Sequence, residues 1–275
     1  MRNILWNIKR QKANFWEANL RNAMLQEAEL READILKADL RNAVLWKANL
    51  RGADLWKTDL RRAVLMEVNL READLQETNL RGANLQGANL RGADLRKANL
   101  MEADLQGADL RETDLRETDL WRANLRDANL MGADLRLADL GRADLQNAIF
   151  QEADLWRVNL KGADLEGANL QEADLTGADL QNAIFWKADL READLWRANL
   201  RNAVLQEADL RGTILIGSNL MGAKLRKAKG LKVKQLSDVK TLYKAEFDLE
   251  LKMQIKTEYP HLLEKSEGQK PGFCS

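Results

Sequence analysis

The chain has 275 residues and a net charge of zero, with 43 Lys and Arg against 43 Asp and Glu. Its single histidine, His261, and single cysteine, Cys274, lie near the C-terminus, which argues against His-based acid–base chemistry, a Cys nucleophile and a His/Cys metal cluster. There is no apolar run of transmembrane length and no signal-peptide pattern, and one unpaired cysteine favours a reducing cytoplasm. We therefore expect no enzyme, no cofactor and no metal site.

Residues 1–11 contain Leu5, Trp6 and Ile8 and keep the five-residue spacing of the following segment only loosely, because Arg10 stands where the next apolar residue is due. A strictly repetitive segment follows them. If that segment pairs its backbone from one repeat unit to the next, its first unit has an open edge that would recruit another chain unless it is covered. We expect residues 1–11 to form this N-terminal cap.

Residues 12–225 repeat a unit of five residues, Ala-(Asp/Asn)-Leu followed by two variable residues. We call the Leu position i, so that Ala is i−2 and Asp or Asn is i−1. A helix would turn successive leucines by about 140° around its axis, and a flat strand would alternate them between its faces. Only a chain that bends once per repeat keeps them together, with Ala and Leu inside and Asp or Asn outside. The i residues other than Leu are Phe15, Ile35, Phe150 and Phe185.

Residue types also recur every 20 residues, which is every four repeats. This longer period predicts coils with four sides, stacked at the spacing of a β ladder. The clearest example is a column of i−1 aspartates: Asp34, Asp54, Asp74, Asp94, Asp114, Asp134, Asp154, Asp174 and Asp194. Gly and Asn concentrate at i+2, where a type II turn needs positive φ. Where Glu or Lys holds i+2, we expect another turn type.

The repeats resemble the pentapeptide-repeat family, whose consensus A(D/N)LXX they match almost unit by unit. The resemblance implies an all-β solenoid, a right-handed quadrilateral β-helix, here of about 11 coils.

The pattern stops after Leu225, and residues 226–264 predict a short C-terminal α-helical cap. Ser237 is a suitable N-cap for a first helix, in which Val239, Leu242, Tyr243 and Phe247 share one face. A second helix is expected from Asp248 to the residue before Pro260. A strand is the alternative for the second segment, because apolar residues alternate there. The tail resembles C-terminal caps of other bacterial family members. It is expected to cover the last coil and to pair two rods as a homodimer, and the candidate residues for the cap or the dimer contact are Val239, Leu242, Tyr243, Phe247, Leu251, Ile255 and Tyr259. Residues 265–275 are expected to be disordered.

The aspartate column is a candidate for binding cations or for imitating the phosphates of DNA. Some pentapeptide-repeat proteins protect DNA gyrase from quinolones as DNA mimics. Residues 1–225 have 32 Lys and Arg against 36 Asp and Glu, however, and no loop interrupts the repeats. We favour a solvated face of ion pairs, in which six of these aspartates meet the arginine three residues before them: Arg31, Arg51, Arg71, Arg91, Arg111 and Arg191. Nucleic-acid binding is not expected either, because acidic and basic residues alternate.

All eight tryptophans occupy i+1, at the outward corners, and several coincide with apolar i−1 residues. They either cover backbone or form a contact surface for another protein. The two candidate surfaces comprise Met24, Val44, Trp46, Val64 and Met66, and Ile184, Trp186 and Val204. We predict a non-enzymatic protein-binding or scaffolding rod whose partner the sequence does not identify, with a topoisomerase-binding DNA mimic as the alternative.

Overall fold

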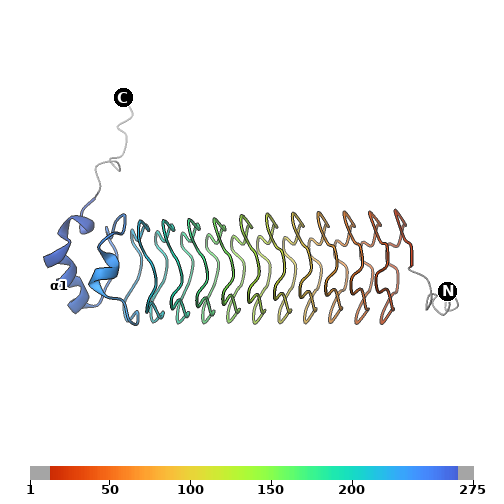
Figure 1. Cartoon of the computed structure of the whole chain (residues 1–275), viewed down its shortest axis with the longest axis horizontal. Helices are drawn as coiled ribbons and strands as arrows, with labels where there is room; N and C mark the ends of the chain where they lie inside the picture. The colour runs from red at the N-terminus through yellow and green to blue at the C-terminus, as the bar shows by residue number, and fades with distance from the viewer. Residues whose placement is uncertain (1–12, 266–275) are drawn as a thin grey trace, which may run out of the picture.

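The computed structural model describes residues 13–265 as a rod of stacked coils with a small helical cap at its C-terminal end (Figure 1). The predicted N-terminal cap over residues 1–11 lies outside the described residues. The same holds for the predicted disordered tail, apart from Lys265.

Each coil takes four repeats, because each i−1 residue forms a parallel β-bridge with the i−1 residue four repeats later, as Asp34 does with Asp54. The N–H of Asp54 donates to the carbonyl oxygen of Ala33 in the preceding coil (2.9 Å), and the N–H of Ile35 donates to the carbonyl oxygen of Asp54 (2.8 Å). The pairings are isolated bridges rather than long strands, since a corner follows every three extended residues. The predicted period of four repeats is confirmed.

Each coil has four such bridges and therefore four faces. Two faces matter below. The Asp face has the i−1 residues Asn14, Asp34 and so on through Asp194 to Ile214. The Val face comes two repeats after the Asp face in each coil. Its i−1 residues are Met24, Val44, Val64 and so on through Ile184 and Val204 to Lys224 and Glu246.

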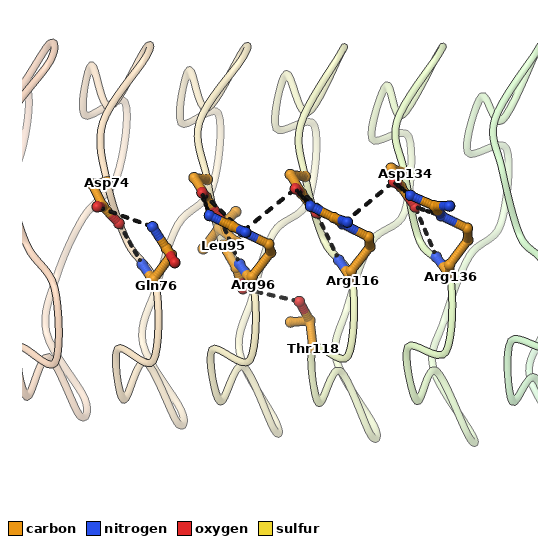
Figure 2. Close-up of polar contacts among 10 residues, drawn as sticks. Asp74, Gln76, Leu95, Arg96, Arg116, Thr118, Asp134 and Arg136 are labelled. Carbon is orange, nitrogen blue, oxygen red and sulfur yellow. Dashed lines mark hydrogen bonds and ion pairs between the residues drawn. The ribbon is translucent and has the colours of Figure 1, made fainter.

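Leucine and alanine fill the interior, as predicted. Nearly every i and i−2 side chain from Ala28 to Leu225 is buried, and each buried Leu contributes about 1.5–3 kcal/mol relative to an exposed one. Threonine takes the place of alanine at some i−2 positions, and its buried hydroxyl donates a hydrogen bond to a backbone carbonyl oxygen. Thr118 Oγ1, for example, donates to the carbonyl oxygen of Leu95 at 3.0 Å (Figure 2).

The corners are uniform. The residue at i+2 has positive φ whether it is Gly or not, from 52° at Arg157 to 72° at Gly212. The expectation of another turn type at Glu and Lys is therefore wrong, as Glu17 and Lys37 have φ of 53° and 54°. The cost of left-handed backbone in these residues, about 1 kcal/mol each, is offset by a hydrogen bond between coils, such as that from Lys37 N–H to the carbonyl oxygen of Trp56 (2.9 Å).

The solenoid continues beyond Leu225. Thr241 pairs with Asn219 and Glu246 pairs with Lys224, and in both pairs the partners are two positions further apart in sequence than in the regular coils. Leu242 and Phe247 lie inside this last stretch, so the helix predicted from Ser237 through Phe247 is wrong. Ser237 instead follows a short 3-10 helix, η2 (Val233–Leu236).

The second predicted helix is present. Helix α1 (Leu249–Glu258) begins after the N-cap Asp248, ends before Pro260, and is followed by the 3-10 helix η3 (Pro260–Leu263). Ile255 is buried and Leu251 is partly buried against the core. These helices lie at the C-terminal end of the rod (Figure 1).

Candidate interaction surface

The structure places both candidate surfaces on the Val face. Near the N-terminal end, consecutive bridges join Met24 to Val44 and Val44 to Val64, and Trp46 and Met66 stand at the adjoining corner one coil apart. Near the C-terminal end a bridge joins Ile184 to Val204, with Trp186 at the same corner. Met24 is 65% exposed, and all of these side chains are at least partly exposed. We call these groups the N-terminal patch and the C-terminal patch.

The stretch of the Val face between the patches is polar and internally bonded. Asn124 Nδ2 donates to Asp104 Oδ1 at 3.0 Å, and Gln146 Nε2 donates to Asp164 Oδ2 at 2.7 Å. The two patches are therefore separate apolar areas on one face, divided by side chains that already satisfy one another.

The apolar patch residues replace a side chain that stabilises the corner elsewhere. At most other i−1 positions, Oδ1 of Asp or Asn accepts a hydrogen bond from the N–H of i+1, as Asp54 does from Trp56 at 3.1 Å. Val and Ile cannot accept it. The N–H groups of Trp46, Met66 and Trp186 consequently have no acceptor among residues 13–265. Sequence analysis missed this role of Asp and Asn.

The tryptophans are covered on one side by a neighbouring cation. Lys187 Nζ lies 3.9 Å from the centre of the Trp186 ring, and Lys47 Nζ lies 4.5 Å from that of Trp46. The same pairing of i+1 with i+2 occurs at four further tryptophans, Trp56, Trp121, Trp156 and Trp196. Each contact contributes about 0.5–1 kcal/mol at an exposed site. Each of these rings thus has a cation on one of its faces.

The middle of the Asp face is a ladder of alternating charges (Figure 2). Arg116 Nη2 lies 2.5 Å from Asp114 Oδ2 in its own coil, and its Nε lies 3.5 Å from Asp134 Oδ2 in the next. Arg96 and Arg136 repeat this arrangement. The arginines at i+1 of the same face are therefore the partners of Asp94, Asp114, Asp134 and Asp154. The predicted partners three residues earlier are wrong. Arg51 and Arg71 meet Glu72, Arg91 meets Glu112, Arg111 meets Asp109, Arg191 meets Asp189, and Arg31 has no ion pair among residues 13–265.

The ladder ends at Asp154, because the i+1 residue after it is Trp156 and not an arginine. Burial raises the pKa of Asp154, and repulsion from Asp134 and Asp174 adds to the effect. Arg136 Nε, 3.4 Å from Asp154 Oδ2, only partly offsets it. The remaining carboxylates of the column have no ion-pair partner within residues 13–265: Asp34, Asp54, Asp74, Asp174 and Asp194.

The described part of the chain has no group of three or more His, Cys, Asp or Glu residues arranged to hold a metal ion. Within residues 13–265 no helix has the length and apolar character needed to span a membrane.

Most of the tail residues proposed for a dimer contact face the rod instead. Val239, Leu242, Phe247 and Ile255 are buried, and Leu251 and Tyr259 are partly buried against the same core. Tyr243 stands at a corner beside Lys244. A dimer contact through the cap would have to use other residues.

Two exposed apolar residues that sequence analysis missed, Ile214 and Ile216, lie on the Asp face at its C-terminal end. The available signal was the break in the aspartate column, where Ile214 follows Asp194.

Comparison with protein families finds pentapeptide repeats in 8 copies, over residues 11–46, 47–82, 78–116, 108–147, 138–177, 148–186 and 188–226. No curated protein matches the chain.

Among solved structures, the chain is 35% identical to HetL, a pentapeptide repeat protein involved in regulation of heterocyst differentiation in Nostoc sp. strain PCC 7120, over 81% of this chain and 95% of that one (TM-score 0.39). It is 34% identical to a pentapeptide repeat protein from the Arabidopsis thaliana thylakoid lumen, over 36% of this chain and 68% of that one (TM-score 0.35). It is 17% identical to QnrB1, a plasmid-mediated fluoroquinolone resistance protein, over 72% of this chain and 86% of that one (TM-score 0.40). With the repeat matched along most of its length, the chain belongs to the pentapeptide-repeat family.

Proposed function

We propose that this chain is a non-enzymatic scaffolding rod that binds a partner protein through the two apolar patches of the Val face. The observation that carries the proposal is the missing corner hydrogen bond. An Asp or Asn in place of Val44, Val64 or Ile184 would accept a hydrogen bond from an N–H that now has no acceptor among residues 13–265. The free energy of unfolding would rise by about 0.5–1.5 kcal/mol per site. Apolar side chains at these exposed positions favour contact with a partner over stability of the isolated rod.

The spacing of the patches supports a scaffold role. Six bridges separate Val64 from Ile184, which corresponds to about 29 Å along the rod. A single partner that reaches both patches gains from an intramolecular second contact, and two small partners can be held side by side.

The test uses substitutions that preserve the rod. Val44→Asn with Val64→Asn removes the apolar character of the N-terminal patch, and Ile184→Asn with Val204→Asn removes that of the C-terminal patch, while Asn suits the i−1 position in both. Wild type, each double variant and the matched control Asp144→Asn are immobilised and used to capture proteins from the source cells. We expect at least one protein that binds wild type and the control but does not bind one of the double variants. Identical captured sets for all four would refute the proposal.

The DNA-mimic alternative has weaker support. The central carboxylates of the Asp face are bridged by Arg96, Arg116 and Arg136. The β-bridges keep a strict spacing of four repeats as far as Lys229, so no loop projects from this stretch. A DNA gyrase supercoiling assay separates the two: inhibition by the added rod, or protection from a quinolone, would favour the mimic.

A homodimer through the C-terminal cap is a further part of the proposal. The exposed apolar residues of α1 are Leu249 and Met253, one helical turn apart, and they support such a contact. Light scattering should give twice the chain mass for wild type and one chain mass for Leu249→Glu with Met253→Glu. One chain mass for both would remove the dimer and leave the Val face proposal untouched.

A further inference from the structure

The Asp face ends in a cavity at the C-terminal end of the rod. It has a volume of about 700 Å³ and lies between the coil residues 211–216 and the segment 230–238, which includes η2. The chain leaves the regular register here, since the partners of the next bridges, Asn219 with Thr241 and Lys224 with Glu246, are two positions further apart in sequence than before. Ile214 and Ile216 form apolar walls, and they are 42% and 49% exposed.

Two backbone donors face this cavity without acceptors. In the preceding coil, the N–H of Glu192 donates to the carbonyl oxygen of Arg211, and the N–H of Leu195 donates to that of Ile214. The equivalent residues one coil later are Gly212 and Leu215, both lining the cavity. Their N–H groups have no acceptor among residues 13–265.

The neighbouring backbone acceptors, in contrast, are already occupied. Gln235 Nε2 donates to the carbonyl oxygens of Leu210 (3.0 Å) and Thr213 (3.1 Å). The edge of the solenoid at this point therefore offers donors only. A ligand that completes it must bring hydrogen-bond acceptors, and an extended peptide supplies them as backbone carbonyl oxygens.

The charge of the rim agrees with the polarity of the edge. Lys232 and Lys234 line the cavity and have no ion-pair partner among the described residues. Arg211 is paired with Asp209 at 2.6 Å, and the carboxylate of Asp238 accepts a hydrogen bond from Ser237 Oγ at 2.7 Å. The hydroxyl donor leaves the charge of Asp238 in place, so two unpaired lysines face one unpaired carboxylate, and the net unpaired charge at the rim is positive.

We propose that this cavity binds an extended acidic peptide segment of a partner protein beside the Gln235 side chain, at the end of the Asp face. Its carbonyl oxygens accept the N–H groups of Gly212 and Leu215. Its apolar side chains contact Ile214 and Ile216, and its carboxylates lie near Lys232 and Lys234. Main-chain bonds to a free sheet edge supply affinity, and the flanking side chains supply specificity. This site is independent of the Val face patches.

The test is a titration of the ¹⁵N-labelled full chain with a short capped peptide of alternating Val and Glu, with the matching Val and Lys peptide as a probe control. We expect saturable shifts of the Gly212 and Leu215 amide signals with the acidic peptide only. Lys232→Glu with Lys234→Glu should weaken binding at least tenfold, and added salt should weaken wild-type binding. Lys252→Glu with Lys256→Glu, the same charge change at exposed sites of α1, should leave the affinity unchanged.

Several results would overturn the proposal. One is that the basic peptide binds as tightly as the acidic peptide. Another is that the acidic peptide binds without shifting the amide signals of Gly212 and Leu215. Deletion of residues 266–275 that shifts these two signals without any peptide would show that the chain fills its own cavity. A dimer that the Lys232→Glu, Lys234→Glu variant dissociates would assign the cavity to a second copy.

Discussion

Gln235 donates its side-chain amide to the carbonyl oxygen of Thr213 at 3.1 Å, in the place where the backbone N–H of another coil would lie. The cap uses similar substitutes elsewhere. The carbonyl oxygen of Leu262 in η3 accepts the N–H of Leu242 (2.8 Å), and Asp248 Oδ2 accepts that of Lys227 (2.8 Å). Side chains and helix ends thus terminate the solenoid by satisfying backbone groups at its open edge.

Gln235→Leu should loosen the cap. The substitution removes the donor to two backbone acceptors, the carbonyl oxygens of Leu210 and Thr213, and we expect a loss of about 1–3 kcal/mol in the free energy of unfolding. Urea denaturation measures it, and hydrogen exchange should locate the faster opening at residues 230–247. Gln254→Leu on the exposed side of α1 is the matched control. Equal stability of the two variants would contradict the capping role.

Most of the rod could be predicted from sequence because one geometric rule repeats. Any residue at i or i−2 has the same surroundings as the equivalent residues one coil before and after it, so a single correct unit fixes the rest of the interior. The candidate patches followed from the same rule, since residues four repeats apart on one face are adjacent, as Val44 and Val64 are.

The C-terminal end could not be predicted in this way. One further repeat is formed by Ala245, Glu246 and Phe247, and Leu242 lies one repeat before Phe247. Two additional residues upstream of this stretch shift its register relative to the regular coils. The same apolar residues also fit one face of a helix, and sequence spacing alone did not separate these two arrangements. The cavity depends on where the backbone leaves the coil, which no periodic pattern specifies.

Gly230→Ala should destabilise the chain more than Gly107→Ala. Both glycines have positive φ, 68° and 65°, so both variants bear the cost of left-handed backbone, about 1 kcal/mol. A Cβ at Gly107 meets nothing within 4 Å, whereas a Cβ at Gly230 would lie 2.1 Å from Arg211 Cγ and 3.2 Å from Arg211 Cα. Thermal unfolding of the two variants measures the difference. A lower melting temperature for Gly107→Ala would show that segment 230–238 does not lie against Arg211.

Asp154→Asn and Asp109→Asn should have opposite effects on stability at neutral pH. The hydrogen bond from Arg111 lowers the pKa of Asp109, so its charged form is favourable in the folded chain. Burial raises the pKa of Asp154, so its charged form is unfavourable there. We expect Asp109→Asn to lose roughly 0.5–1 kcal/mol and Asp154→Asn to gain a few tenths, about 0.3 kcal/mol. Urea denaturation at pH 7 tests the signs.

The pH dependence follows from the directions of the two pKa shifts. Asp109 has a lowered pKa in the folded chain, so its contribution is present above the ordinary value of about 3.9 and is lost as the pH falls through the lowered value. Asp154 has a raised pKa, so the folded chain loses stability as the pH rises from the ordinary value through the raised one. The advantage of Asp154→Asn should therefore vanish in acid. An advantage that persists below pH of about 3 would point to packing rather than charge.

Val44→Asn with Val64→Asn should stabilise the isolated rod while removing the N-terminal patch. The new Oδ1 atoms can accept the N–H groups of Trp46 and Met66, as Asp54 does from Trp56. We expect the free energy of unfolding to rise by about 0.5–1.5 kcal/mol per site, measured by urea denaturation. Asn84→Val, at the next i−1 position of the same face, removes the bond that Asn84 Oδ1 accepts from Gln86 N–H at 3.1 Å and should lower stability by a similar amount. If Val44→Asn with Val64→Asn instead lowers stability, valine at these positions contributes to the fold, and the apolar patches would lose their main argument as binding surfaces.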